Sequence, residues 1–122
     1  MGTSTNTLKF VKAGNTSEYN DGSKKKVTLN GQEIMLARVG TNFYAVDNRC
    51  PHMGGDLSMG TLEGTVITCP RHGSQFDLRD GHNIRWTRYT GALKTINTLY
   101  KTPRPVKTHQ VKVEGNDILV EL

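Results

Sequence analysis

Two short stretches of this 122-residue chain each place a cysteine beside a histidine, "RCPHMGG" at 49–55 and "TCPRHGS" at 68–74. Cys50 precedes His52 by two positions, and Cys69 precedes His72 by three. The chain has no other cysteine. Thiolate and imidazole groups both bind iron, zinc and copper. Two such stretches brought face to face would therefore offer four metal ligands.

A redox metal centre competes with a disulfide, with unrelated thiols and with a zinc site. A structural disulfide between Cys50 and Cys69 is disfavoured in a chain expected in the cytosol, where thiols stay reduced. Unrelated buried thiols would account for one Cys–His pair more readily than for two matching pairs. A Cys₂His₂ zinc site is the stronger alternative, but zinc sites usually group the cysteines in one segment and the histidines in another. Each stretch here is mixed, which suits a binuclear centre with two chemically different ends.

Short strands are the elements that must position these stretches. The segment 24–39 predicts a hairpin around Asn30-Gly31, because this dipeptide favours a two-residue type I′ turn. Further strands are expected at 43–47, 64–70, 109–114 and 118–122. The expected strands at 43–47 and 64–70 lead directly to Cys50 and Cys69. With 13 glycines at turn-like spacings, the pattern predicts an all-β, antiparallel sandwich or barrel.

The two motifs, "CPH" at 50–52 and "CPRHGSQFD" at 69–77, resemble the cluster-binding motifs of the Rieske iron–sulfur family. The likeness extends over 43–81, and "VKVEGNDILVEL" at the end of the chain is similar to the closing hairpin of that family. The resemblance implies a single domain over 1–122 with a smaller cluster-binding subdomain at approximately 46–82. Residues at approximately 83–102 form an insertion relative to small Rieske ferredoxins.

The resemblance also implies the cofactor and its ligands. One [2Fe–2S] cluster is expected, with Cys50 and Cys69 on the inner iron and His52 and His72 on the outer iron near the surface. Histidine in place of cysteine on one iron raises the reduction potential. The implied function is one-electron transfer from a reductase to a terminal oxygenase or another acceptor, without substrate chemistry by this chain. A Rieske subunit of a larger oxidoreductase, such as nitrite reductase, and a zinc-stabilised interaction module remain alternatives.

Four residues beside the ligands are expected to tune the reduction potential: Gly55, Gly73, Ser74 and Phe76. The two glycines let backbone N–H groups approach the cluster and donate to its sulfur atoms. In high-potential members of the family, a serine and a tyrosine two residues later donate hydroxyl hydrogen bonds to sulfur. This chain keeps the serine but has phenylalanine for the tyrosine. The resemblance therefore implies a potential low in the Rieske range of roughly −150 to +300 mV.

Positive charge is concentrated in the second half of the chain. The net charge is +5, whereas 71–107 alone holds eight basic and two acidic residues, a net charge of +6. A docking surface for acidic redox proteins is expected at Arg71, beside the ligand His72, and at Pro103, Arg104 and Pro105, which resemble the third loop of the family. No nucleic-acid motif accompanies the basic residues, so nucleic acid is not an expected partner.

Other features bear on location and on the remaining side chains. No apolar run reaches the ~20 residues of a membrane-spanning helix, and 1–10 lacks the pattern of a secretory signal; the cytoplasm is the expected location, without a membrane partner. His82 and His109 are predicted to be surface side chains. Trp86 is predicted to anchor 83–102 on the domain, with partner docking as the alternative. A short helix is possible at 93–100.

Overall fold

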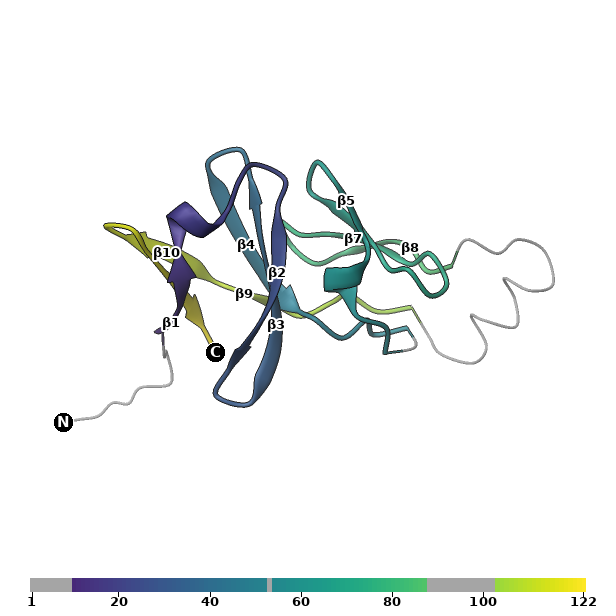
Figure 1. The fold of residues 1–122 in the computed structure, drawn as a ribbon. Coiled ribbons are helices and arrows are strands. Elements are labelled where there is room, and N and C mark those ends of the chain that lie inside the picture. Colours follow the sequence, from purple (N-terminus) through teal and green to yellow (C-terminus); the bar gives the residue numbers. More distant parts are fainter. Residues whose placement is uncertain (1–9, 53, 88–102) are drawn as a thin grey trace.

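The computed structural model describes residues 10–52, 54–87 and 103–122, in which every strand pair is antiparallel (Figure 1). The strands are β1 (Phe10–Asn15), β2 (Lys24–Leu29), β3 (Gln32–Val39), β4 (Asn42–Asp47), β5 (Thr61–Glu63), β6 (Val66–Thr68), β7 (Gln75–Asp77), β8 (Asn83–Arg85), β9 (Thr108–His109), β10 (Val111–Glu114) and β11 (Asp117–Glu121). Two 3₁₀ turns, η1 (Thr16–Glu18) and η2 (Leu57–Met59), interrupt them. The predicted all-β, antiparallel fold class is confirmed. Within the described ranges, no helix has the length and apolar character needed to cross a membrane.

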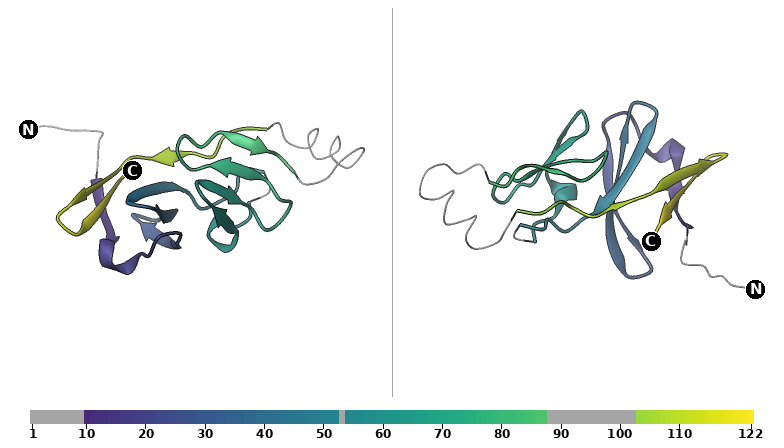
Figure 2. Two further views of the ribbon diagram at one scale, coloured as in Figure 1. Left: turned by 90° about the horizontal axis from the view of Figure 1, so that it is seen from above. Right: turned by 180° about the vertical axis from the view of Figure 1, so that it is seen from behind.

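Three sheets lie side by side in the molecule. Their strand orders are β1-β11-β10, β2-β3-β4-β9 and β5-β6-β7-β8. The sheet of β2, β3, β4 and β9, here called the middle sheet, lies between the C-terminal sheet of β1, β10 and β11 and the third sheet of β5–β8, as the views in Figure 2 show. The middle sheet therefore has a hydrophobic core on each of its faces.

The middle of strand β3 is a continuous apolar run because both faces of the strand are buried. Ile34 and Leu36 belong to the core shared with the C-terminal sheet, whereas Met35 and Ala37 belong to the core shared with the third sheet. All four side chains are buried. Because successive side chains of a strand point to opposite faces, a strand covered on both faces needs apolar residues at every position.

The predicted hairpin at 24–39 is confirmed. Asn30 has φ 50° and Gly31 has φ 81°, and two consecutive positive φ values are what a type I′ turn requires. The expected strands at 43–47 and 118–122 appear as β4 and β11, and the one at 64–70 appears as the shorter β6. The single strand expected at 109–114 is divided, because His109 ends β9 in the middle sheet and Val111 begins β10 in the C-terminal sheet. The sequence pattern does not predict β1, β5, β7 or β8, the last three of which have three residues each.

The return of the chain from the third sheet to the middle sheet is held by backbone hydrogen bonds. Val106 N donates to Gly81 O at 3.0 Å, and Asp47 N donates to Lys107 O at 2.9 Å. The third sheet extends to Arg85, and the limits of the smaller subdomain stay a prediction. Of the predicted insertion at 83–102, residues 83–85 form β8; residues 88–102, with the expected helix, lie outside the described residues.

His109 corrects one prediction. Its side chain is only 2% exposed, so the prediction of a surface side chain is wrong. Nδ1 lies 2.9 Å from the carbonyl oxygen of Glu121, and Nε2 lies 2.8 Å from Oδ1 of Asp47. The burial follows from the pairing of β9 with β4, which is a long-range contact. His82 is exposed, as predicted.

Asp77 on β7 is a buried carboxylate that is stabilised in its charged form. Oδ1 accepts from the backbone N and from Nε of Arg79 at 2.9 and 3.0 Å, and Oδ2 accepts from Nη2 of Arg79 at 2.7 Å. These hydrogen bonds hold the pKa of Asp77 well below its usual range, although burial opposes the shift. Because the folded-state pKa is lower than the unfolded one, the carboxylate stabilises the fold above about pH 4, and this contribution is lost as the pH falls below that value.

We therefore expect Asp77→Asn to lower the free energy of unfolding at pH 7 by about 1–3 kcal/mol. The variant should also lose less stability than the wild type between pH 5 and pH 3, because it has no carboxylate to protonate at this position. Urea unfolding at both pH values measures both effects. Asp80→Asn, at an exposed carboxylate in the same turn, is the control and should change little. Equal acid sensitivity of wild type and Asp77→Asn would contradict this account.

Candidate metal centre

The first Cys-Pro stretch forms a tight loop after β4. Cys50 N donates to Gly55 O at 2.7 Å, and Gly54 N donates to Cys50 O at 2.8 Å. Gly54 has φ 77°, a conformation that favours glycine. The side chain of Arg49 packs across this glycine, since a Cβ there would lie 2.9 Å from Nη2 of Arg49. Sequence reasoning missed Arg49, although it immediately precedes Cys50.

The second Cys-Pro stretch forms a loop of the same conformation between β6 and β7. Cys69 N donates to Ser74 O at 2.8 Å, and Gly73 N donates to Cys69 O at 3.2 Å. In each loop the cysteine N–H therefore bonds to the carbonyl five residues later, and the cysteine carbonyl accepts from the glycine four residues later. Gly73 has φ 77°, the same value as its counterpart in the first loop. The similarity seen in the sequence is thus a repeated backbone structure.

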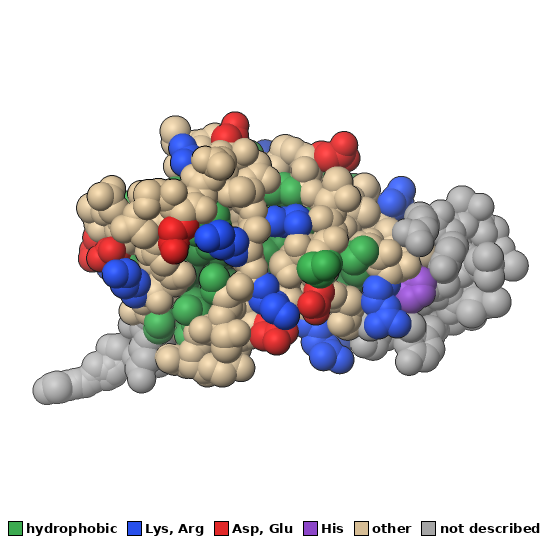
Figure 3. All heavy atoms as spheres, viewed as in Figure 1, with side chains coloured by type: hydrophobic (Ala, Val, Ile, Leu, Met, Phe, Trp, Pro, Cys, Tyr) green, Lys and Arg blue, Asp and Glu red, His purple; other side chains and the backbone are tan. Residues whose placement is uncertain are grey.

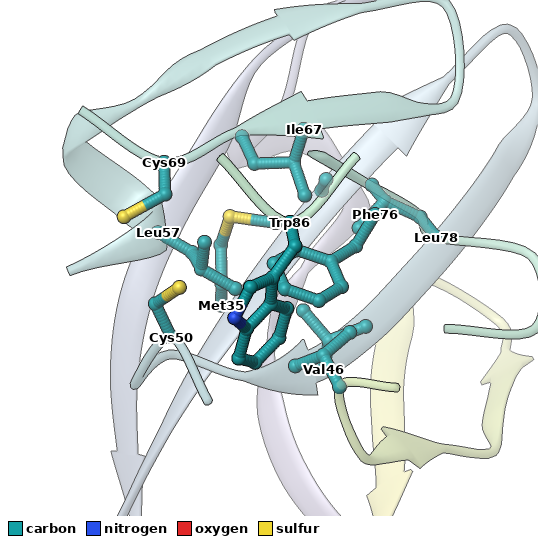
Figure 4. Packing of buried hydrophobic residues seen from close by; sticks show 11 residues of the cluster. Met35, Val46, Cys50, Leu57, Ile67, Cys69, Phe76, Leu78 and Trp86 are labelled. Carbon is teal, nitrogen blue, oxygen red and sulfur yellow. The ribbon is translucent and has the colours of Figure 1, made fainter. Parts of the chain in front are cut away.

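The two loops bring the four predicted ligands together. Cys50 and Cys69 form no disulfide and are each 2% exposed, and Figure 4 shows them beside each other at one side of the packed core. The ring centroids of His52 and His72 lie 5.1 Å apart. His52 is buried, whereas His72 is partly exposed. The histidine side of the site therefore reaches the surface, while the thiols do not.

The surroundings of Cys69 favour its thiolate form. A hydrogen bond from the Cys50 thiol makes the largest contribution, and the backbone N–H groups of Arg71 and His72 and the Arg71 charge add to it. Together these groups outweigh the effect of burial and lower the pKa of Cys69 from 9.0 to about 6. The thiolate is the form of cysteine that binds metals, so this position is prepared for a metal at neutral pH.

The residues present fit a Rieske-type [2Fe–2S] cluster. Gly55 lies so close to Cys69 that a Cβ there would be 2.9 Å from Sγ, and a side chain would fill space next to the sulfur. Two thiols and two imidazoles are the donor set of Rieske centres. Within the described ranges, no three His, Cys, Asp or Glu side chains are grouped closely enough to share one metal ion.

Ser74 and Phe76, both predicted to tune the potential, are fully buried beneath the second loop. Ser74 Oγ donates to the carbonyl oxygen of Trp86 and lies 3.1 Å from Nδ1 of His52. Phe76 packs in the same core as Trp86 (Figure 4). Trp86 is 6% exposed, as expected of a residue that anchors its segment. The tuning roles of Ser74, Phe76 and the two loop glycines stay predictions.

Sequence reasoning missed two side chains that hold the second loop from the end of β8. Arg85 Nε donates to Gly73 O at 3.0 Å, and Thr87 Oγ1 donates to His72 O at 3.2 Å. These contacts depend on the pairing of β7 with β8. No local sequence signal marks them, because Arg85 and Thr87 are more than ten residues away from the loop they support.

A hollow of about 530 Å³ opens beside the first loop. Cys50 and His52 line it, together with Arg49, Arg104, Pro105 and Lys107. Two of the predicted docking residues, Arg104 and Pro105, thus lie beside the metal centre. Of the other two, Pro103 is exposed, and Arg71 is exposed on the second loop with its side chain against Gly55. Figure 3 shows a histidine and several Lys or Arg side chains together at the β8 end of the face drawn.

Comparison with known proteins identifies the family. The model of the Rieske [2Fe–2S] domain matches residues 9–97. The chain is 34% identical over 116 residues to the ferredoxin component of the naphthalene 1,2-dioxygenase system of Pseudomonas aeruginosa, covering 95% of this chain and 98% of that protein. It is 28% identical over 115 residues to the biphenyl dioxygenase ferredoxin subunit of Pseudomonas sp. strain KKS102, covering 93% of each protein.

Solved structures agree with this assignment. The ferredoxin of carbazole 1,9a-dioxygenase from Nocardioides aromaticivorans IC177 superimposes with a TM-score of 0.73 at 28% identity, over 91% of this chain and 95% of that one. A complex of reduced oxygenase and oxidized ferredoxin of carbazole 1,9a-dioxygenase matches with a TM-score of 0.74 at 27% identity, over 92% of each chain. These relatives decide between iron–sulfur and zinc in favour of the cluster. The chain belongs to the Rieske [2Fe–2S] domain family and is an electron carrier with one Rieske-type cluster.

Proposed function

We propose that this protein carries single electrons from a reductase to the terminal oxygenase of a ring-hydroxylating dioxygenase system. Cys50 and Cys69 would hold the inner iron, and His52 and His72 the outer iron. When bound, the cluster supplies a one-electron redox couple. The exposure of His72, beside buried thiols, carries the proposal, because it would bring the outer iron close to the surface where a partner docks.

Electron flow to an oxygenase tests this function. The protein is reduced with dithionite, freed from the excess reductant and mixed without oxygen with the terminal oxygenase of its source organism. We expect the visible absorbance of the oxidised cluster to return as one electron passes to the oxygenase. Cytochrome c serves as a general acceptor. Reoxidation by cytochrome c but by none of the oxygenases of the source organism would contradict the proposal.

The proposal includes a free carrier that works in the cytoplasm. The naphthalene dioxygenase relative is named a ferredoxin component and is matched over 98% of its length, which favours a separate carrier over a subunit of a larger oxidoreductase. The two cysteines form no disulfide, as is usual in a reducing compartment. Size-exclusion chromatography of the endogenous protein separates the alternatives, because a permanent subunit would elute with its larger enzyme, whereas a free carrier would elute near 13.5 kDa or as a small homo-oligomer.

The docking partner is proposed to present acidic side chains. Arg49, Arg104 and Lys107 line the hollow beside the first loop, and among the described residues that line it Asp47 is the one acid. Arg71 adds a further positive charge next to His72. Opposite charges around a docking site speed the encounter of two proteins and orient them, more than they increase the final affinity.

We expect Arg71→Glu to slow electron transfer to the oxygenase about tenfold at low ionic strength, because the reversed charge repels an acidic partner. The difference from wild type should shrink at high salt, where charges are screened. Stopped-flow rates at several salt concentrations measure both effects. Lys112→Glu makes the same charge change on β10 in the C-terminal sheet, at the other end of the molecule (Figure 1), and should change the rate little. Equal slowing by both variants would contradict docking at Arg71.

A further inference from the structure

Trp86 lies directly against one of the proposed ligands, His52. Its ring centroid is 4.7 Å from that of His52, with the two planes tilted by 48°. It belongs to the same buried core as Cys50 and Cys69. Its carbonyl oxygen accepts the hydroxyl hydrogen bond of Ser74. The indole is therefore fixed in position both by core packing and through its backbone.

The indole nitrogen of Trp86 is a buried hydrogen-bond donor that has no acceptor within the part of the chain that the structure describes. Buried tryptophan N–H groups usually have a hydrogen-bond partner, because an unsatisfied buried donor is costly. An indole N–H has no acceptor function and one fixed direction. The site around Trp86 should therefore contain an acceptor that the described protein atoms do not supply.

The position of the nitrogen indicates which acceptor this is. In Figure 4 the nitrogen lies on the edge of the Trp86 ring nearer to Cys50, on the side of the core where the two thiols lie. The cluster, which belongs between the two thiols, is rich in sulfur acceptors. We propose that the indole N–H of Trp86 donates a hydrogen bond to a sulfur atom of the cluster, either a sulfide or Sγ of a cysteine ligand, and raises the reduction potential.

The neighbouring residues Ser74 and Phe76 do not supply a hydrogen bond to a cluster sulfur. The hydroxyl group of Ser74 has a single proton, which it donates to the carbonyl oxygen of Trp86. Phe76 has no polar hydrogen. Ser74 thus acts through Trp86, because its hydrogen bond holds the backbone that carries the indole. The Trp86 donor comes from the residue after β8. In high-potential members of the family, the donors come instead from the positions of Ser74 and Phe76.

The sign of the effect follows from charge. A reduced cluster carries one more negative charge than an oxidised cluster, so a donor to sulfur stabilises the reduced form more. Removal of the N–H should therefore lower the potential. This inference rests on the proposed ligand set, because Trp86 reaches a cluster sulfur only if the two loops hold the cluster.

The first experiment measures the potential of Trp86→Phe by protein-film voltammetry. We expect the equilibrium constant for reduction to fall about tenfold, which corresponds to about 59 mV for a one-electron couple. Met35→Leu is the matched control, because Met35 is a buried member of the same core and the change conserves its volume. Its potential should equal that of the wild type. An unchanged potential in Trp86→Phe would overturn the proposal.

The second experiment needs no variant and separates a hydrogen bond from a packing effect. Trp86 is the only tryptophan of the chain, so growth with ¹⁵N-indole tryptophan labels this one nitrogen. Pulsed electron paramagnetic resonance of the reduced cluster should detect a hyperfine coupling to this ¹⁵N and to an exchangeable proton. A Rieske signal without the ¹⁵N coupling, or an exchangeable-proton spectrum of Trp86→Phe identical to that of the wild type, would overturn the role of Trp86. Failure of the ligand set would differ, because the Rieske signal itself would then survive substitution of Cys69.

Discussion

Replacement of Cys69 by alanine is expected to abolish cluster assembly and to yield protein without the red-brown colour of [2Fe–2S] centres. In the proposed ligand set, Cys69 supplies one of the two thiolates of the inner iron. The only other cysteine of the chain, Cys50, already has a place in that set, so no thiolate remains as a substitute. Cys69 is also the thiol whose pKa is lowered to about 6. Iron and sulfide content, visible absorbance and the electron paramagnetic resonance spectrum of dithionite-reduced protein measure the loss.

The control for this experiment lies in the same loop. Arg71→Ala removes an exposed side chain two residues away and should keep most of the iron, since the Arg71 charge contributes least to the lowered pKa of Cys69 and the backbone N–H groups remain. Low iron in both variants would point to damage of the loop in general. Cys69→Ala protein with normal iron content and an unchanged spectrum would show that the ligand assignment is wrong.

Gly81→Ala is expected to cause a large loss of stability. Gly81 has φ 81°, and a Cβ at this position would lie 2.2 Å from the carbonyl oxygen of Val106. That oxygen belongs to the backbone, which cannot move away as a side chain would. Since Gly81 also bonds to Val106 N at 3.0 Å, the methyl group would push apart the connection between the third sheet and β9. We expect a loss of ~3–5 kcal/mol in the free energy of unfolding.

Gly64→Ala isolates the effect of the clash. Gly64 has φ 59°, yet a Cβ there would meet no atom within 4 Å. This variant should lose only the ~1 kcal/mol that a left-handed conformation costs a non-glycine residue. Thermal unfolding of the cluster-loaded proteins, followed by circular dichroism, compares the two. A similar melting temperature for both variants would show that the contact of Gly81 with Val106 contributes little.

The parts of the fold that could be predicted from the sequence are those with a local cause. Asn30-Gly31 predicts its hairpin because few other dipeptides adopt two positive φ values. Strands β5, β7 and β8 have three residues each, too few to show a period, and only their pairing with one another defines them. The burial of His109 could not be predicted, because it depends on the pairing of β9 with β4. The one local signal for the burial of His109 is its position two residues before Val111, because alternate residues of a strand point to the same face.

The candidate site divides in the same way. Cys50, His52, Cys69 and His72 could be predicted as ligands from residue type, spacing and resemblance to the Rieske motifs, and this ligand set stays a prediction. The residues that support these four side chains could not be predicted from the sequence. Trp86 and Thr87 follow His72 by fourteen and fifteen positions, and they reach the second loop only because β8 pairs with β7. Arg49 adjoins a predicted ligand, but an exposed arginine next to a cysteine has no spacing rule that would single it out.

The two matching loops belong to different sheets, since the first follows β4 of the middle sheet and the second joins β6 to β7 of the third sheet. With the proposed ligands, the cluster closes the chain into a ring that runs from residue 50 to residue 69. Such a cross-link restricts the unfolded chain as a disulfide does, and for a ring of this size the entropic stabilisation is about 3 kcal/mol. With these ligands, the iron–sulfur centre would cross-link the middle sheet and the third sheet in a protein that has no disulfide between its two cysteines. The bonds that hold the redox centre would then also stabilise the fold.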